Sequence, residues 1–143
     1  MLNTTKSNLF RIKADALGQG VNNLGKMSAG IALKFKQKYP EMYKEYVKLC
    51  SEKLLKPGEI FFYKSQKKPY VVNMATQDVL SKANLQYVEM CFDRILSQYT
   101  QWGIKTLAIP KIGCGLGGLD WKDVESLLNK KFQKSDLEII VCL

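Results

Sequence analysis

Histidine is absent from this sequence, and its four cysteines stand far apart, with no CxxC pair among them. The residue sets that usually hold zinc are therefore missing. Catalysis by Cys–His or Ser–His–Asp groups is excluded for the same reason, because each needs an imidazole. We interpret Cys50, Cys91 and Cys142 as small apolar residues of the interior, whereas Cys114 stands among glycines. We expect neither a metal ion nor a cofactor.

Long apolar runs are also lacking. None approaches the length needed to cross a membrane, and the N-terminal stretch MLNTTKSNLF has no apolar segment of a secretory signal. We therefore expect a cytoplasmic protein without a membrane partner. With 143 residues, of which 46% are hydrophobic, the chain is long enough to bury a core without disulfides. It shows no repeat and no linker, so we predict one domain over residues 1–143 and a monomer.

Acidic residues are outnumbered, because 22 lysines and arginines face 13 aspartates and glutamates and give a net charge of +9. This excess favours an anionic partner. The lysines are dispersed along the chain, and neither a basic arm nor the aromatic and basic pattern of an RNA-recognition sheet is present. A small ligand that carries phosphate fits the charge. A weak surface contact with nucleic acid is kept as the alternative.

Strand and helix patterns alternate along the chain. Short apolar stretches bounded by turn residues predict strands at 14–22, 60–64, 69–76, 104–110 and 137–143. Apolar residues at steps of three and four predict helices at 29–39, 40–55 and 84–99 and from Asp120 onward, with Asn84 and Asp120 as N-caps. In the first helix we expect Ile31, Ala32 and Phe35 to point inward. The alternation predicts an α/β fold with a largely parallel central sheet, whose ligand crevice lies beyond the carboxyl ends of the strands.

Two loops carry an unusual number of small residues. In LAIPKIGCGLGGLDW, at 107–121, glycines occupy positions 113, 115, 117 and 118, directly before a predicted helix. Glycines let successive backbone N–H groups turn toward a ligand, and such a nest beside a helix N-terminus binds phosphate. The motif is neither a P-loop nor the GxGxxG turn of an initial βαβ unit. GKMSAGIA, at 25–32, opens another helix at the same end of the sheet. Two such loops suit an extended ligand with phosphates in its middle, and a tight turn without a ligand is the alternative for each.

The stretches IPKIGCGLGGLDW and MSAGIALKFKQKYPEMYKEY resemble those of a macrodomain, the fold that recognises ADP-ribose. The similarity runs from about residue 8 to residue 143. It is strongest to terminal ADP-ribose glycohydrolase and to the macrodomain antitoxins that remove ADP-ribose from DNA. The resemblance implies a single three-layer α/β/α domain with a mixed, largely parallel sheet. It also implies that ADP-ribose or an ADP-ribosylated macromolecule is the partner, with nucleic acid only as a modified substrate or a weak surface contact.

The resemblance implies the binding residues as well. Asn8 would accept a hydrogen bond from the adenine amino group through its amide oxygen. Phe10 and Leu143 would lie near the adenine, and Asn22 near the distal ribose. The loop from Gly25 to Ile31 would close over the ribose and the phosphates, and the loop from Ile112 to Gly117 would be the second phosphate loop. The full implied set is Asn8, Leu9, Phe10, Asn22, Gly25, Met27, Ser28, Ala29, Gly30, Ile31, Thr76, Gln77, Ile112, Gly113, Cys114, Gly115, Leu116, Gly117 and Leu143.

Two positions depart from the glycohydrolases of this subgroup. Gln77 stands where those enzymes carry a catalytic lysine after a threonine, which is Thr76 here. Glutamine can neither form a Schiff base with an opened ribose nor act as a charged nucleophile. Gly117 stands where the human-type enzyme has an aspartate. The remaining candidates for catalysis are Asn22, Gln77 and Asp78, and a solvated turn residue is the alternative interpretation of Asp78.

Three classes of function follow from these observations. The first is a module that binds ADP-ribose. The second is a hydrolase of the same fold that works without the lysine on a water oriented by Asn22, as an ADP-ribosyl ester hydrolase, a glycohydrolase or an ADP-ribose 1''-phosphate phosphatase. The missing histidine weakens the phosphatase version, because its general acid would have to come from another residue. The third is a nucleic-acid-binding protein whose cleft no longer takes a nucleotide.

Overall fold

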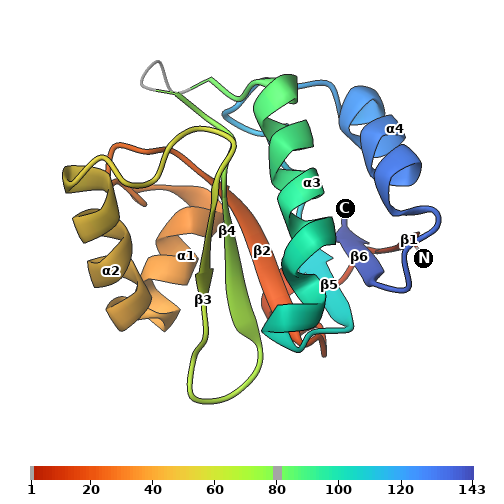
Figure 1. The fold of residues 1–143 in the computed structure, drawn as a ribbon, viewed down its shortest axis with the longest axis horizontal. Coiled ribbons are helices and arrows are strands. Elements are labelled where there is room, and N and C mark those ends of the chain that lie inside the picture. The colour runs from red at the N-terminus through yellow and green to blue at the C-terminus, as the bar shows by residue number, and fades with distance from the viewer. Residues whose placement is uncertain (1, 79–81) are drawn as a thin grey trace.

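A six-stranded sheet forms the centre of the molecule (Figure 1). The computed structural model describes residues 2–78 and 82–143. Only the edge strand β3 runs antiparallel to its neighbour, and the other four pairings are parallel. From one edge to the other the strands are β1 (Leu2–Thr5), β6 (Glu138–Cys142), β5 (Thr106–Ile109), β2 (Ala16–Val21), β4 (Tyr70–Ala75) and β3 (Ile60–Tyr63). This confirms the predicted α/β class with a mixed, largely parallel sheet.

Two pairs of helices cover the two faces of the sheet. Helices α1 (Gly30–Lys38) and α2 (Pro40–Ser51) lie on one face, and α3 (Leu85–Trp102) and α4 (Trp121–Phe132) lie on the other (Figure 1). Each face has its own cluster of buried apolar side chains. The result is the predicted α/β/α arrangement of three layers. None of the helices in the described ranges is long and apolar enough to span a membrane.

The helix ends follow the capping rules. The Asn84 side chain accepts hydrogen bonds from Gln86 N and Tyr87 N, and α3 ends at Gly103 with a φ of 72°. The Asp120 side chain accepts a bond from Lys122 N at the start of α4. Both predicted N-caps are therefore confirmed.

Two elements at the N-terminus were not predicted. Strand β1 pairs in parallel with β6, although its residues are mostly polar, because an edge strand needs only one hydrogen-bonded neighbour. A short 3-10 helix, Leu9–Arg11, follows it. Leu143 N donates a hydrogen bond of 2.9 Å to Thr5 O, so the start of the chain lies beside its end.

The first turn of α1 corrects one prediction. Phe35 is fully buried, as expected, and Ala32 is half-buried, but Ile31 is 36% exposed. The helix begins at Gly30, and its first turn borders a cleft, whereas Phe35 one turn further on is buried in the core. Ile31 consequently lines a cleft instead of the interior.

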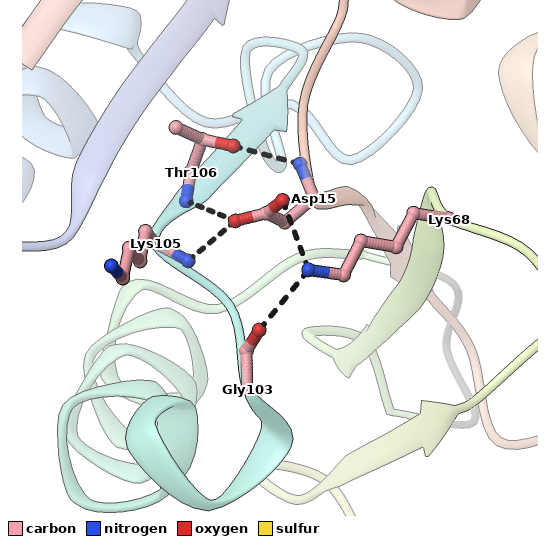
Figure 2. A network of polar contacts seen from close by, with 5 residues as sticks. All are labelled: Asp15, Lys68, Gly103, Lys105 and Thr106. Atoms are coloured by element: carbon pink, nitrogen blue, oxygen red, sulfur yellow. Dashed lines mark hydrogen bonds and ion pairs between the residues drawn. The ribbon is translucent and has the colours of Figure 1, made fainter.

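At the amino-terminal end of the sheet, Asp15 joins several segments (Figure 2). Its Oδ2 accepts from Lys105 N at 2.7 Å and from Thr106 N at 3.3 Å, and its Oδ1 pairs with Lys68 Nζ at 3.2 Å. Lys68 Nζ also donates to Gly103 O at 3.4 Å. Partial burial acts to raise the pKa of Asp15, but the Lys105 N–H, the Lys68 ammonium and the Thr106 N–H outweigh it and lower this pKa.

Candidate functional site

A cleft of about 1070 Å³ lies at the opposite end of the sheet, where β2, β4, β5 and β6 end. This is the end at which parallel sheets place their ligands. The loops that follow these strands, together with the segment after β1, form its walls. The lining residues are Lys6, Ser7, Asn8, Leu9, Phe10, Gln19, Gly20, Val21, Asn22, Leu24, Lys26, Ser28, Ala29, Gly30, Ile31, Ala32, Lys34, Thr76, Gln77, Pro110, Lys111, Ile112, Gly113, Cys114, Gly115, Leu116, Gly117, Cys142 and Leu143.

The first wall is the loop from Asn22 to Ala29, which we call loop one. It is followed by α1, whose N-cap residue Ala29 makes no side-chain capping bond. The first N–H groups of a helix have no partner within the helix, and the helix dipole makes this end attractive to anions. Ser28 and Ala29 are exposed and line the cleft, so the start of α1 opens onto it. Loop one therefore offers backbone donors to a negatively charged ligand.

The second wall is the loop from Pro110 to Leu119, which we call loop two. Gly113 has a φ of 76°, and its carbonyl accepts from Leu119 N at 2.9 Å, which folds the loop back on itself. At Gly117 a Cβ would lie 2.7 Å from both Ala83 Cβ and Gly113 O, whereas at Gly115 it would meet nothing within 4 Å. Glycine at 117 is therefore required by packing, and glycine at 115 leaves open space on the side of the cleft. The aspartate that the human-type enzyme carries in this loop has no room at 117 in this arrangement.

The charges around the cleft are of one sign. Lys6, Lys26, Lys34 and Lys111 line it, and no aspartate or glutamate is found among the lining residues of the described ranges. Such a field raises the local concentration of anions. Asp78, one of the candidates for catalysis, is not among the lining residues.

One end of the cleft, beside β6 and the 3-10 helix, is largely apolar. Leu9 is buried, Phe10 packs edge-on against Phe35 with ring centroids 4.8 Å apart, and Leu143 is 52% exposed. The Asn8 side chain caps the 3-10 helix by accepting from Phe10 N at 2.9 Å. The amide oxygen that we expected to meet an adenine amino group is thus already engaged in a local bond. This end suits a flat aromatic group.

The other end, where β2 and β4 finish, is polar and is lined by Asn22, Thr76 and Gln77. Thr76 is fully buried, and its Oγ1 has no hydrogen-bond partner among the described residues. A Cβ at Gly20 would lie only 2.8 Å from this oxygen. Gln77 pairs in an isolated bridge with Ala83. Hydroxyl and amide groups at this end suit a sugar.

Gln19, a polar residue within β2, lies deeper in the cleft and is 1% exposed. Its Nε2 donates to Asn73 Oδ1 at 2.8 Å, and Asn73 Nδ2 donates to Phe61 O at 3.2 Å. Because Phe61 O can only accept, the orientation of both amides follows, and Gln19 Oε1 is the atom left over. It has no partner among the described residues. A buried acceptor without a partner is costly, so a hydrogen-bond donor from a water molecule or from a ligand would stabilise it.

Several predicted residues take supporting places. Met27 is 1% exposed, and its Sδ lies 3.8 Å from Gln19 Nε2, beneath loop one. Gly25 is outside the lining set, and its φ of 80° turns loop one toward α2. Asn22 lines the cleft, but its Oδ1 accepts from Leu24 N at 3.0 Å and its Nδ2 donates to Lys26 O at 3.0 Å. It therefore builds loop one as well as facing the cleft. The remaining predicted residues, from Asn8 to Phe10, from Ser28 to Ile31, Thr76, Gln77, 112–117 and Leu143, all line the cleft.

The cysteine thiols are not activated. Cys114 Sγ donates to Ile112 O at 3.3 Å, and burial raises the pKa of Cys114. Burial also raises the pKa of Cys91 to about 12 and raises the pKa of Cys50 and of Cys142. A nucleophilic cysteine needs the opposite shift. Over the ranges that the structure describes, no group of three or more acidic or cysteine side chains is placed to hold a metal ion.

The lining residues missed by the sequence interpretation include all four lysines and Gln19. Lys6, Lys26, Lys34 and Lys111 are dispersed in sequence, so no local pattern indicates that they meet. Gln19 did leave a signal, because a glutamine in the middle of the apolar strand ALGQGV requires a partner.

Residues 19–128 match the family model of the Macro domain. The chain therefore belongs to the Macro domain family. It is 31% identical over 146 residues to the DNA ADP-ribosyl glycohydrolase of Mycobacterium tuberculosis, covering 99% of this chain and 42% of that protein. The chain thus spans less than half the length of this relative.

Solved structures of related proteins agree with this family assignment. The macrodomain of Mycobacterium tuberculosis DarG superposes with a TM-score of 0.92 at 31% identity, over 100% of this chain and 98% of that one. Thermosipho africanus DarTG in complex with ADP-ribose gives a TM-score of 0.91 at 26% identity, over 99% of this chain and 41% of that one. The resemblance noted in the sequence is thereby confirmed.

Proposed function

We propose that the cleft binds ADP-ribose, either free or attached to a macromolecule. The observation that carries this proposal is the order of chemical groups along the cleft. An apolar end at Leu9, Phe10 and Leu143 is followed by two loops rich in backbone donors and flanked by lysines, and then by a polar end at Asn22 and Thr76. ADP-ribose has the same order of groups, with a base, a diphosphate and a second ribose. The related Thermosipho protein, solved in complex with ADP-ribose, supports the choice.

The diphosphate is the part of the ligand with the most partners. The N-terminus of α1 and the folded backbone of loop two approach it from two sides, and the four lysines add positive charge. The second ribose supplies hydroxyl donors that the unpartnered oxygens of Gln19 and Thr76 lack. The predicted binding residues that line the cleft keep these roles under the proposal, with residues 1–143 acting as one monomeric, cytoplasmic domain.

Titration calorimetry with ADP-ribose, ADP, AMP and ribose 5-phosphate tests the proposal. We expect ADP-ribose to bind most tightly, because it alone reaches both ends of the cleft and both phosphate-binding loops. ADP should bind more weakly and ribose 5-phosphate weakest. A chain that shows no heat with ADP-ribose but binds an RNA or DNA oligonucleotide tightly would contradict the proposal and favour the nucleic-acid alternative.

A hydrolase is the second candidate, and the name of the Mycobacterium relative motivates it. The side chains of the cleft do not favour it. Gln77 lines the cleft without a charge, a carboxylate has no room at Gly117, and the Cys114 thiol has a raised pKa. Asn22 uses its oxygen in loop one, so it can hold a water molecule through an N–H group but cannot remove a proton from it. Binding is therefore the function that these residues support best.

Product detection separates the two candidates. The chain is incubated with ADP-ribosylated protein, ADP-ribosylated DNA and ADP-ribose 1''-phosphate, and released ADP-ribose or phosphate is measured. We expect no turnover by the wild-type chain. Gln77→Lys places an amine at the polar end of the cleft, so it should produce measurable glycohydrolase activity if the lysine is the only missing group. Turnover by the wild type would make the hydrolase the correct assignment.

A further inference from the structure

Helix α2 carries a buried tyrosine directly beneath loop one. Tyr46 is fully buried, and its hydroxyl lies 2.8 Å from Asn22 O and 2.6 Å from Asn22 Oδ1. Burial raises the pKa of Tyr46, so the hydroxyl keeps its proton and acts as a donor. A second tyrosine of the same helix, Tyr43, donates to Gly25 O at 3.0 Å. Two hydroxyls from α2 thus hold the backbone and one side chain of loop one.

The bonds of Asn22 differ in what they fix. Its Oδ1 accepts from Leu24 N at 3.0 Å and more weakly from Lys26 N at 3.5 Å, and its Nδ2 donates to Lys26 O at 3.0 Å. These partners belong to loop one and move with it. Tyr46 belongs to the buried apolar cluster that also contains Phe35 and Met42, so its bond fixes the Asn22 amide relative to the rest of the fold.

The orientation of the Asn22 amide decides what it offers to the cleft. Its oxygen is shared between two backbone N–H groups and the Tyr46 hydroxyl, which uses its capacity as an acceptor. Its nitrogen has two hydrogens, and Lys26 O takes one of them. Asn22 lines the polar end of the cleft, so the other hydrogen is the group available to a ligand oxygen.

We propose that Tyr46 is a positioning residue that gives the cleft its preference for a ligand with a second ribose over one that ends at the diphosphate. It acts through Asn22, by holding the amide so that an N–H group meets a hydroxyl oxygen of that ribose. The inference rests on the proposed function, because it concerns the polar end of the same cleft. Under this proposal the Asn22 side-chain amide contacts neither the base nor the diphosphate.

Tyr46→Phe tests the inference, because it removes one oxygen atom and keeps the buried ring. We expect the affinity for ADP-ribose to fall about 5- to 20-fold, as for the loss of a hydrogen bond of moderate strength, while the affinity for ADP changes less than about 2-fold. Tyr39→Phe is the matched control, since the Tyr39 hydroxyl donates to Pro69 O at 3.3 Å, away from the cleft. It should leave both affinities unchanged.

The outcomes are distinct. Equal losses for ADP-ribose and ADP in Tyr46→Phe would show a general structural role and overturn the inference, as would no loss at all. In an Asn22→Ala background the Tyr46 hydroxyl keeps only the backbone oxygen of position 22. Tyr46→Phe should then no longer change the ratio of the affinities for ADP-ribose and ADP, because the side-chain amide through which it acts is absent. Failure of the wild type to bind ADP-ribose would overturn the proposed function and this inference with it.

A measurement on the wild type covers the case in which Tyr46→Phe does not fold. Nuclear magnetic resonance should detect a slowly exchanging Tyr46 hydroxyl proton in contact with Asn22. The Asn22 side-chain amide signals should shift on addition of ADP-ribose and stay in place on addition of ADP. Equal shifts with the two ligands would overturn the inference.

Discussion

The two ends of the central sheet differ in whether their polar atoms have hydrogen-bond partners. At the amino-terminal end, both carboxylate oxygens of Asp15 have partners, and Lys68 is shared between that carboxylate and Gly103 O (Figure 2). At the carboxyl end, Gln19 Oε1 and Thr76 Oγ1 are buried without a partner in the described ranges, and the start of α1 lacks a side-chain cap. The first end satisfies its own hydrogen bonds, whereas the second has unpaired polar atoms, which we propose that a ligand satisfies.

This difference separates stability from binding within one sheet. Satisfied polar groups at a sheet end hold its segments together, and unsatisfied ones lower stability until a ligand pairs with them. Substitutions at the Asp15 end should therefore change the free energy of unfolding and leave the affinity unchanged. Substitutions at cleft positions where an added side chain meets no other group, such as Gly115, should change the affinity and leave the free energy of unfolding nearly unchanged.

The largest effect is expected at Gly115 in loop two. Gly115→Glu should reduce the affinity for ADP-ribose by about 100-fold or more, because a carboxylate would lie among groups that attract the diphosphate. The melting temperature should stay nearly constant, since a Cβ at this position meets nothing within 4 Å. Calorimetric titration and thermal unfolding measure the two quantities. Gly115→Gln adds similar bulk without charge, and wild-type affinity in Gly115→Glu would mean that loop two does not face the phosphates.

The second-largest effect is expected on the free energy of unfolding, when Asp15 is substituted. Asp15→Asn should lower the free energy of unfolding by about 1–2 kcal/mol, because it weakens charge-assisted bonds to Lys105 N and Lys68. The expected loss of unfolding free energy is kept small because the Lys68 side chain is 45% exposed, so solvent screens its ion pair with Asp15. Denaturant unfolding measures this change. A loss of ADP-ribose affinity in Asp15→Asn would contradict the conclusion that this end of the sheet affects stability but not binding.

The pH dependence of the same pair follows from the lowered pKa of Asp15. A carboxylate with a lowered pKa in the folded state contributes its full stability above its ordinary value of about 3.9 and loses it as the pH falls through the lowered value. The wild type should therefore be more stable than Asp15→Asn at neutral pH. This advantage should disappear on acidification below about pH 4, as measured by unfolding at a series of pH values. A constant difference down to strongly acidic pH would contradict it.

The smallest effect is expected at Gln19. Gln19→Leu should reduce the affinity for ADP-ribose about 3- to 10-fold by removing the buried acceptor of a ligand donor. It also leaves Asn73 Oδ1 without its donor, which would lower stability. The double variant Gln19→Leu with Asn73→Leu removes both partners and should recover stability but not affinity. Recovery of affinity in the double variant would show that Gln19 stabilises the fold but does not contact the ligand.

Local patterns in the sequence were sufficient for the alternation of elements, for both N-caps and for the two glycine-bearing loops. These features depend on residues within one or two turns of each other, so their spacing is visible in the chain. The same reasoning failed at β1, which depends on pairing with β6 at the far end of the chain. It also failed at Ile31, which has helical periodicity but lines the cleft.

By itself, the sequence determined the fold class, the family and the two backbone loops that we propose to hold the diphosphate. Only the tertiary structure decided which side chains meet around them. Gln19 and Asn73 are separated by 54 residues and Tyr46 and Asn22 by 24, and four dispersed lysines share one cleft. A pattern of neighbours along the chain specifies local geometry, but contacts between distant residues depend on how the layers pack, and those contacts orient the polar groups of the cleft.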